Sequence, residues 1–391
     1  MQRVFLKKGR EAPVLRGHPW IFSGAIERID DDSASGPVAD VLDSRGTWLA
    51  RGLYNPKSQI RVRVLTWEKE EIDSVFFARR LSQAAALRAR LLTASTDGYR
   101  LVNGEGDLLP GLVIDRYADF LVCQFFTAGI DGLKSSTVEA LSTLFTPKGI
   151  YERSEGGVRD EEELAPSVGV LAGEEPPELI EIAENGLKFL VDVRAGQKTG
   201  FFLDQRDNRA LLSAISQGAK VLNCFGYSGA FAAYALEGGA SQVISVDTSR
   251  AALDLAKQTF DLNGFSTAAY DLIRADVFSY LKSCTDEFDI LVLDPPSLAH
   301  RRGDVDAAAG SYKFLNLHAL RLLHPGGLLL TFSCSQHLSR DLFQKIVFGA
   351  AVDAGRKVQL LKRVGHPPDH PVSLHHPEGE YLKGLLLKVL E

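Results

Sequence analysis

The second half of the chain alternates short apolar runs with helical patterns, and this alternation constrains the fold more than any other sequence feature. The apolar runs cover residues 220–223, 242–246, 289–293 and 328–332, and helical patterns cover 229–237, 249–263, 311–323 and 339–354. Apolar strands that alternate with helices are typical of a parallel α/β sheet. We therefore predict an α/β fold after about residue 186, with a terminal strand over 384–390.

The first half has a different pattern, and a chain of 391 residues is long enough for two or three domains. Short β-rich runs between glycine and proline turns predict an all-β module over 1–68. A mixture of helices and a hairpin predicts an α+β domain over 69–185, in which the acidic tract 159–164 is expected to be a solvated loop. The α/β domain would then span 186–391.

Composition narrows the class of protein. No run of about twenty apolar residues predicts a membrane span, and the N-terminus lacks the pattern of a secretory signal, so we expect a cytoplasmic location. The four cysteines are far apart, which favours free thiols over a zinc site or a disulfide framework. The net charge of −6 argues mildly against nucleic acid, although a local basic face is enough for phosphate contacts.

Four histidines near the C-terminus could suggest a metal site. These residues are His366, His370, His375 and His376. The prolines between them favour an irregular loop, and no carboxylate or cysteine completes a set of metal ligands at helical spacing. We therefore predict that the protein holds no metal.

A glycine-bearing turn follows the first strand of the α/β domain. It reads Asn223-Cys-Phe-Gly-Tyr-Ser-Gly229, and such a turn lets the backbone approach a ligand closely. The sequence is neither a phosphate-binding loop nor a dinucleotide fingerprint. It predicts cofactor contacts from Phe225, Gly226, Tyr227, Ser228 and Gly229, with an ordinary strand–helix turn as the alternative.

Carboxylates end three successive strands of the same domain. Asp247 is positioned for ribose hydroxyls, Asp276 for an adenine amino group, and Asp294 begins an Asp-Pro-Pro sequence. Helix capping is the alternative for the first two. Together with the glycine turn, they favour a nucleoside cofactor without phosphates, such as S-adenosylmethionine, over NAD.

Cys334 follows the apolar run 328–332, so its thiol and Asp294 are expected at one sheet edge. A buried apolar cysteine is the alternative. A thiolate adding to C6 of a pyrimidine makes C5 nucleophilic, and a carboxyl can orient or protonate the ring. The thiol needs activation, for which His337 or a helix N-terminus near Ser339 is a candidate.

Basic and aromatic residues follow Asp294 in the sequence and suit an RNA backbone and a stacked base. These candidates are Arg301, Arg302, Tyr312 and Lys313. A solvated loop is the alternative reading of this segment.

Several motifs together resemble one family. They are Gly17-His-Pro-Trp-Ile-Phe-Ser-Gly24, the run 196–206, the turn 223–231, Asp294-Pro-Pro and Ser333-Cys-Ser335. The chain resembles bacterial PUA-containing class I S-adenosylmethionine-dependent methyltransferases of large-subunit ribosomal RNA. Its C-terminal half is especially similar to the 5-methylcytosine enzyme acting on 23S rRNA.

The resemblance implies a β-barrel PUA domain, a small α+β domain and a Rossmann-like domain with a seven-stranded, mostly parallel sheet. It implies S-adenosylmethionine as cofactor, Cys334 as nucleophile, and 23S rRNA or its precursor as partner. It also adds Lys198 to the candidate RNA contacts and places five residues around the cofactor: Gln205, Phe225, Asp247, Asp276 and Asp294.

Two departures keep other functions open. Many RNA 5-methylcytosine enzymes carry a second cysteine beside the Asp-Pro motif, where this chain has Pro295, Pro296 and Ser297. A related branch methylates N7 of guanine without a thiol, and a non-catalytic ribosome assembly factor is a further alternative. The sequence leaves open the nucleotide, the form of the RNA substrate, the base that removes the C5 proton, and a homodimer.

Overall fold

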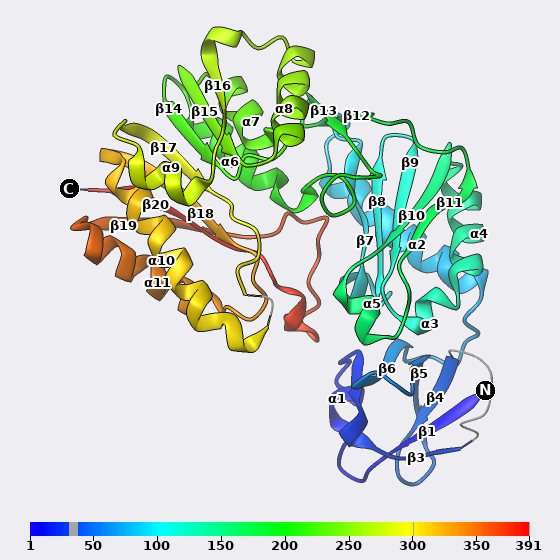
Figure 1. Ribbon diagram of the computed structural model, residues 1–391. Helices are drawn as coiled ribbons and strands as arrows, with labels where there is room; N and C mark the ends of the chain where they lie inside the picture. Colours follow the sequence, from blue (N-terminus) through cyan, green and yellow to red (C-terminus); the bar gives the residue numbers. More distant parts are fainter. Residues whose placement is uncertain (31–37, 300, 391) are drawn as a thin grey trace. The chain divides into compact units, whose positions relative to one another are not determined.

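The computed structural model describes residues 1–30, 38–299 and 301–390, which form two compact units (Figure 1). The first unit comprises Met1–Asn185, Val191–Leu203 and Pro368–Gly379, and the second comprises Gly186–Leu190, Asp204–Pro367 and Glu380–Glu391. The chain therefore passes more than once from one unit to the other. The division into three domains at 68 and 185 stays a prediction.

The N-terminal part of the first unit contains one six-stranded sheet in the order β2-β6-β5-β4-β1-β3. Its pairs are antiparallel except for β1 with β4. Buried aliphatic residues such as Val4, Val41 and Val62 form its core, beside the short helix α1 (Ala12–Leu15). The strands are β1 (Gln2–Leu6), β2 (Trp20–Phe22), β3 (Ile26–Asp30), β4 (Val38–Leu42), β5 (Trp48–Tyr54) and β6 (Ile60–Thr66).

A five-stranded sheet follows in the order β11-β10-β9-β8-β7. The long helix α2 (Ser74–Leu91) begins at Asp73, whose carboxylate caps it, and α2 packs with α4 (Lys134–Phe145) over the sheet. The strands are β7 (Gly98–Asn103), β8 (Leu112–Tyr117), β9 (Phe120–Phe125), β10 (Gly149–Ser154) and β11 (Ser167–Gly173), and α3 (Ala128–Asp131) is a short helix. The predicted hairpin is the antiparallel pair β8–β9.

The acidic tract 159–164 is only in part the solvated loop that its charge predicts. Asp160, Glu161 and Glu163 are exposed, but the tract overlaps helix α5 (Gly157–Glu161), and the residues Arg159 and Glu162 are each only 3% exposed. Arg159 pairs with Asp131 at 3.0 Å, and Glu162 pairs with Arg63 at 2.8 Å. The Arg159 and Glu162 charges are buried because each has an opposite charge within reach, which the sequence pattern alone does not reveal.

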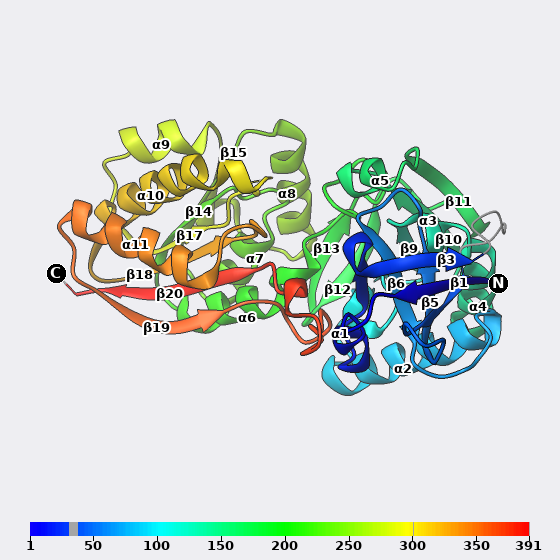
Figure 2. The same ribbon diagram turned by 90° about the horizontal axis from the view of Figure 1, so that it is seen from below.

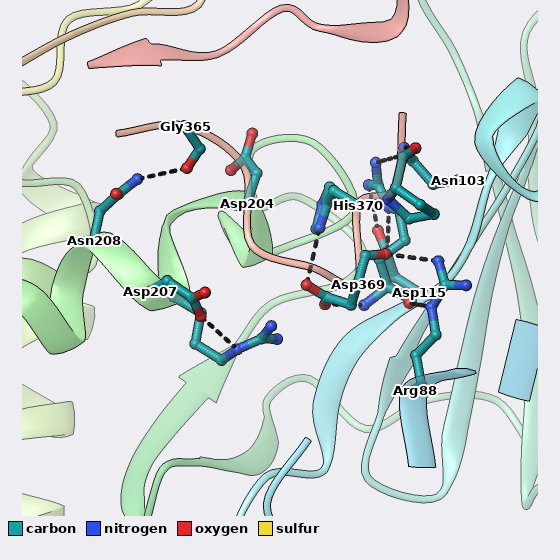
Figure 3. Close-up of polar contacts among 12 residues, drawn as sticks. Arg88, Asn103, Asp115, Asp204, Asp207, Asn208, Gly365, Asp369 and His370 are labelled. Carbon is teal, nitrogen blue, oxygen red and sulfur yellow. Dashed lines mark hydrogen bonds and ion pairs between the residues drawn. The ribbon is translucent and has the colours of Figure 1, made fainter. Parts of the chain in front are cut away.

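A cluster of buried polar contacts explains why 368–379 belongs to the first unit (Figure 3). Arg88 donates to the carbonyl oxygen of Asp369 at 2.6 Å and to the carboxylate of Asp107 at 2.5 and 2.8 Å. The amide of Asn103 donates to the carbonyl oxygen of Pro371 at 3.0 Å. A guanidinium with several acceptors is a stable buried charge, so this segment is fixed to α2 and β7.

The second unit is built on a seven-stranded sheet in the order β16-β15-β14-β17-β18-β20-β19. The first five strands are parallel, and β20 is antiparallel to both of its neighbours. The predicted α/β fold with a mostly parallel sheet is confirmed. The strands are β14 (Lys220–Cys224), β15 (Gln242–Asp247), β16 (Tyr270–Arg274), β17 (Phe288–Leu293), β18 (Leu323–Ser333), β19 (Val358–Val364) and β20 (Lys383–Val389).

Helices cover both faces of this sheet (Figures 1 and 2). One face carries α9 (Val277–Ser283), α10 (Val305–Arg321) and α11 (Arg340–Ala354), which share a core with β14, β15, β17, β18 and β20. The other face carries α6 (Arg206–Ile215), α7 (Ala230–Glu237) and α8 (Arg250–Leu262). The short strands β12 (Ile180–Glu184) and β13 (Leu187–Val191) flank the first passage between the units.

Register brings the ends of the parallel strands to one edge of the sheet. Leu293 of β17 is aligned with Cys224 of β14 on one side and with Thr331 of β18 on the other. Strand order reverses at β14, which is the point where open α/β sheets form a crevice for ligands. The residues that follow these strands are therefore candidates for a site. Across the described ranges, no helix is long and apolar enough to cross a membrane.

Candidate active site at the carboxyl edge of the parallel sheet

The glycine turn after β14 has a strained backbone and close neighbours. Phe225, Tyr227 and Gly229 have φ angles of 61°, 44° and 76°, in the left-handed region. A Cβ on Gly226 would lie 2.3 Å from Ser245 Oγ, and one on Gly229 would lie 2.8 Å from Ala256 Cβ. Glycine is therefore required at both positions by packing against β15 and α8. Phe225 and Tyr227 are not glycines, so their positive φ angles strain the backbone, as is common at functional sites.

Asp247 connects the end of β15 to the glycine turn. Its carboxylate accepts hydrogen bonds from the backbone N–H of Tyr227 at 2.9 Å and of Ser249 at 2.8 Å. Ser249 caps helix α8, so capping does not explain Asp247. The carboxylate is half-buried and has about four acceptor positions, so it can accept further hydrogen bonds from ribose hydroxyls.

Asp276 is exposed and caps helix α9. Its carboxylate accepts a hydrogen bond from the backbone N–H of Ser279 at 2.8 Å, as the capping alternative predicts. Near it, the rings of Phe225 and Phe278 are perpendicular, with centroids 6.4 Å apart. The interaction of Asp276 with an adenine stays a prediction.

Cys334 lies just beyond the end of β18, beside the residues that follow β17. Its Sγ is 3.9 Å from the carbonyl oxygen of Pro295, which directly follows Asp294. Cys334 and Asp294 are both half-buried. Cys224, by contrast, is fully buried on β14, and burial raises the pKa of its thiol. The alternative of a fully buried apolar cysteine therefore describes Cys224 and not Cys334.

Two buried serines and a tyrosine hold the segment around Cys334. The Tyr312 hydroxyl lies 3.0 Å from both Ser333 Oγ and Ser335 Oγ. Ser335 Oγ also accepts from the backbone N–H groups of Leu298 and Ala299 at 3.2 Å. These contacts join the loop after β17 to the loop after β18, which fixes the thiol near the Asp-Pro-Pro sequence.

Tyr312 is therefore not the RNA-stacking residue that the sequence suggested. Its side chain is fully buried, in the middle of α10 rather than in a loop. The helix begins at Val305, earlier than predicted, and this places Ala308, Tyr312, Leu315 and Ala319 along one buried stripe. Burial also raises the pKa of the phenol.

Comparison with known proteins connects this site to a family. The PUA-like domain matches residues 4–67, and the S-adenosylmethionine-dependent methyltransferase family matches residues 160–388. Ribosomal RNA large subunit methyltransferase I of Enterobacter sp. (strain 638) is 47% identical over 393 residues, covering 99% of this chain and 99% of that protein. The protein of the same name from Serratia proteamaculans (strain 568) is also 47% identical, with the same coverage.

This chain belongs to the ribosomal RNA large subunit methyltransferase I family. The resemblance seen in the sequence is therefore confirmed, and S-adenosylmethionine is the cofactor. Among solved structures, the methyltransferase SMU.776 complexed with SAH is 25% identical and matches with a TM-score of 0.85, covering 100% of both chains. The similarity to these proteins therefore extends over the whole chain.

The residues at the sheet edge fit S-adenosylmethionine. The Asp247 carboxylate suits hydroxyl donors. Two buried polar atoms of the turn, Asn223 Oδ1 and Ser228 Oγ, have no hydrogen-bond partner among the described residues. Gln205, another predicted cofactor residue, is buried at the start of α6 and accepts a hydrogen bond from Asn208 at 2.6 Å. Asn208 also donates to the carbonyl oxygen of Gly365 at 3.1 Å, which orients this pair (Figure 3).

The remaining predicted RNA contacts come from both units, and each is described in its own surroundings. Lys313 is on α10 and pairs with Asp353 at 2.7 Å, and Arg301 is exposed before that helix. The Arg302 side chain lies outside what the structure describes. Lys198 belongs to the first unit, where its ammonium lies 4.5 Å from the centroid of the Phe202 ring. Contacts of Lys198, Arg301, Arg302 and Lys313 with RNA stay predictions.

Three of the four C-terminal histidines make structural contacts. His366 accepts a hydrogen bond from the backbone N–H of Leu382 at 3.0 Å in the second unit. In the first unit, His370 lies 3.3 Å from Asp369 (Figure 3), and the His376 ring lies 4.3 Å from that of Trp20. Within residues 1–30, 38–299 and 301–390, no group of three or more potential ligands could hold a metal ion.

Sequence reasoning missed Lys383, which opens strand β20. It is only 4% exposed, and its ammonium donates to the carbonyl oxygen of Ser335 at 2.6 Å. Burial lowers the pKa of Lys383 to about 8. A lysine at the start of the apolar run 384–387 was a signal in the sequence, but its partner depends on the pairing of β20 with β18. His337, the activating residue that the sequence suggested, is exposed.

Proposed function

We propose that this protein transfers the methyl group of S-adenosylmethionine to C5 of a cytosine in 23S rRNA, through a covalent bond between Cys334 and C6 of the base. The observation that carries the proposal is the half-buried Cys334 thiol, 3.9 Å from the carbonyl oxygen of Pro295 and next to Asp294. Membership of a family whose named members methylate large-subunit rRNA supports the substrate class.

The proposed chemistry begins at the base, because C5 of cytosine is a poor nucleophile. The Cys334 thiolate forms a bond to C6, and the electron pair of the C5–C6 double bond becomes available at C5. S-adenosylmethionine would supply an electrophilic methyl group on a sulfonium, so that C5 gains a bond to the methyl carbon and the electron pair of the broken S–CH3 bond stays on that sulfur. A base then removes the C5 proton, the C6–S bond breaks, and its electron pair returns to sulfur.

Asp294 is proposed to bind the ring while this charge develops. A carboxyl group at the end of β17 can donate to or accept from the N3 side of a cytosine, depending on its protonation. Pro295 and Pro296 restrict the backbone after it, so the carboxyl position is well defined. Around the cofactor, we assign Asp247 to the ribose and Asp276 to the adenine, with Gln205 and the turn Phe225–Gly229 lining the remainder.

The RNA substrate requires further contacts. The PUA-like domain over 4–67 and the basic residues Lys198, Arg301, Arg302 and Lys313 are the proposed contacts with the RNA backbone. Action on 23S rRNA or its precursor also implies the cytoplasmic location expected from the sequence. A homodimer stays a prediction.

Methyl transfer by cysteine variants tests this function. Purified Cys334→Ala is incubated with tritiated S-adenosylmethionine and unmodified 23S rRNA, and Cys284→Ala serves as the matched control. Cys284 is another half-buried thiol, which follows the last residue of α9 and packs against the hydrophobic core of the sheet. We expect at least a thousandfold loss in Cys334→Ala and wild-type transfer in the control.

Other outcomes identify the alternatives. Full transfer by Cys334→Ala contradicts the covalent mechanism, and 7-methylguanine as the product identifies the thiol-free chemistry of the related branch. A wild-type protein that binds rRNA but transfers no methyl group supports a role in ribosome assembly instead.

A further inference from the structure

Lys383 is positioned next to the Cys334 segment by strand pairing. It is the first residue of β20, and in the antiparallel register it lies opposite Ser333 of β18. Its side chain reaches past this pair to the carbonyl oxygen of Ser335, at 2.6 Å. Ser333 and Ser335 flank Cys334, so strand pairing holds the ammonium group against the backbone of the segment that carries the thiol.

Other charged and titratable groups surround this lysine. Arg340, at the start of α11, pairs with Glu380 just before β20, with its Nε 3.1 Å from the carboxylate. This hydrogen bond from Arg340 lowers the pKa of Glu380. The Tyr312 hydroxyl approaches from α10 and is occupied by the two serines. Among these charges, a Cys334 thiolate has the largest effect on the pKa of Lys383, ahead of the opposing effects of Arg340 and Glu380.

The electrostatic interaction of Lys383 with Cys334 favours a thiolate. Burial lowers the pKa of Lys383 to about 8, and a Cys334 thiolate counteracts this by stabilising the ammonium. Coulombic stabilisation is mutual, so the ammonium stabilises the thiolate by the same amount. A charged lysine near the sulfur therefore favours the thiolate form of Cys334.

We propose that the Lys383 ammonium activates Cys334 by stabilising its thiolate. This inference rests on the proposed function, because it supplies the nucleophile of that mechanism. In the step, the S–H bond breaks, the electron pair stays on sulfur and the proton passes to water, without oxidation or reduction. When the C6–S bond later breaks, the electron pair returns to a sulfur that again faces an ammonium. Lys383 acts through Cys334 and is a positioning residue.

Alkylation of the full-length protein by iodoacetamide measures this directly, without RNA or cofactor. The rate of Cys334 modification is followed by peptide mass spectrometry as a function of pH, in wild type, Lys383→Met and Lys383→Arg. The control is Lys345→Met, which removes an exposed lysine of α11 paired with Asp341 at 2.6 Å. Methionine approximates the length of the lysine chain without its charge, whereas arginine keeps a charge.

We expect the pH at which Cys334 is alkylated at half its maximal rate to be at least about one unit higher in Lys383→Met than in wild type. The maximal rate at high pH should be unchanged. At pH 7 this corresponds to a roughly tenfold slower reaction. Lys383→Arg and Lys345→Met should retain the wild-type pH profile. An identical profile in wild type and Lys383→Met overturns the proposal.

A second measurement covers the case in which Lys383→Met does not fold. The ultraviolet absorbance of the thiolate, taken as the difference between wild type and Cys334→Ala, is titrated with pH. Appearance of the thiolate well below about pH 8.5 supports activation, and appearance only at or above that value contradicts it. Full methyl transfer by Cys334→Ala would refute the covalent mechanism but would not change the thiolate titration. Failure of the proposed function and failure of the Lys383 proposal can therefore be told apart.

Discussion

The Tyr312 hydroxyl lies 3.0 Å from Ser335 Oγ, and this contact joins helix α10 to the segment that carries Cys334. Tyr312 and Ser335 are both fully buried, so neither hydroxyl can replace its partner with bulk water. The relationship makes Tyr312 a support for the candidate nucleophile, although it cannot contact RNA.

We predict that Tyr312→Phe lowers the free energy of unfolding by about 1–2 kcal/mol, because Ser333 and Ser335 each lose a hydrogen-bond partner. Methyl transfer should fall as well, since the position of Cys334 is less constrained. Chemical denaturation and transfer rates measure the two effects. The control is Tyr270→Phe, which removes a buried hydroxyl that has no partner in the described part of the chain. Equal effects of the two substitutions would contradict the support role.

We predict that Gly229→Ala destabilises the second unit more than Gly264→Ala does. Both glycines have positive φ, 76° and 72°, but a Cβ at 229 would lie 2.8 Å from Phe260 and Ala256, whereas nothing lies within 4 Å at 264. Gly264→Ala therefore measures backbone strain alone, about 1 kcal/mol. The additional loss of stability in Gly229→Ala measures the steric clash of the new Cβ. Thermal unfolding of both variants provides the comparison, and equal losses would refute the packing argument.

We predict that Asp247→Asn weakens S-adenosylmethionine binding about ten- to a hundredfold, since hydrogen bonds to a charged group contribute about 1.5–3 kcal/mol. Calorimetric titration gives the affinity. Asp271→Asn, on the exposed start of β16, is the control. An unchanged affinity in Asp247→Asn would show that this carboxylate does not bind the cofactor.

We predict that Glu162→Gln destabilises the first unit and makes its stability less dependent on acid pH. Burial alone would raise the pKa of Glu162, but Arg63 and hydrogen bonds from Asn55 and Ser58 outweigh it, so the pKa lies below its usual value. Such a carboxylate adds stability above about pH 4.3, and the contribution is lost as the pH falls through its lower folded value.

Denaturation of Glu162→Gln at neutral pH should show a loss on the order of 3 kcal/mol, because Arg63 is left buried without its counter-ion. The adjacent Glu163→Gln is a matched control, since Glu163 pairs with Lys57 at the exposed surface. A similar loss in both variants, or an unchanged acid profile in Glu162→Gln, would contradict the buried-pair interpretation.

The parts predicted from the sequence are those set by local patterns. Apolar periodicity predicted β14, β15, β17 and β18, and chain order placed Asp247, Asp294 and Cys334 at the ends of parallel strands. Lys383 was missed because its contact with Ser335 depends on the antiparallel pairing of β20 and β18, across 48 residues. Tyr312 was assigned to RNA although it lies in the predicted helix 311–323, because the sequence did not show that this residue is on the buried face of α10.

The central claim is that Cys334 makes 5-methylcytosine in 23S rRNA, and mass mapping of that RNA tests it most directly. The RNA is isolated from a strain lacking this protein and from the same strain carrying wild type or Cys334→Ala. We predict that one 5-methylcytosine disappears in the deletion strain, returns with wild type, and does not return with Cys334→Ala. Its return with Cys334→Ala, or the loss of a 7-methylguanine instead, would contradict the account.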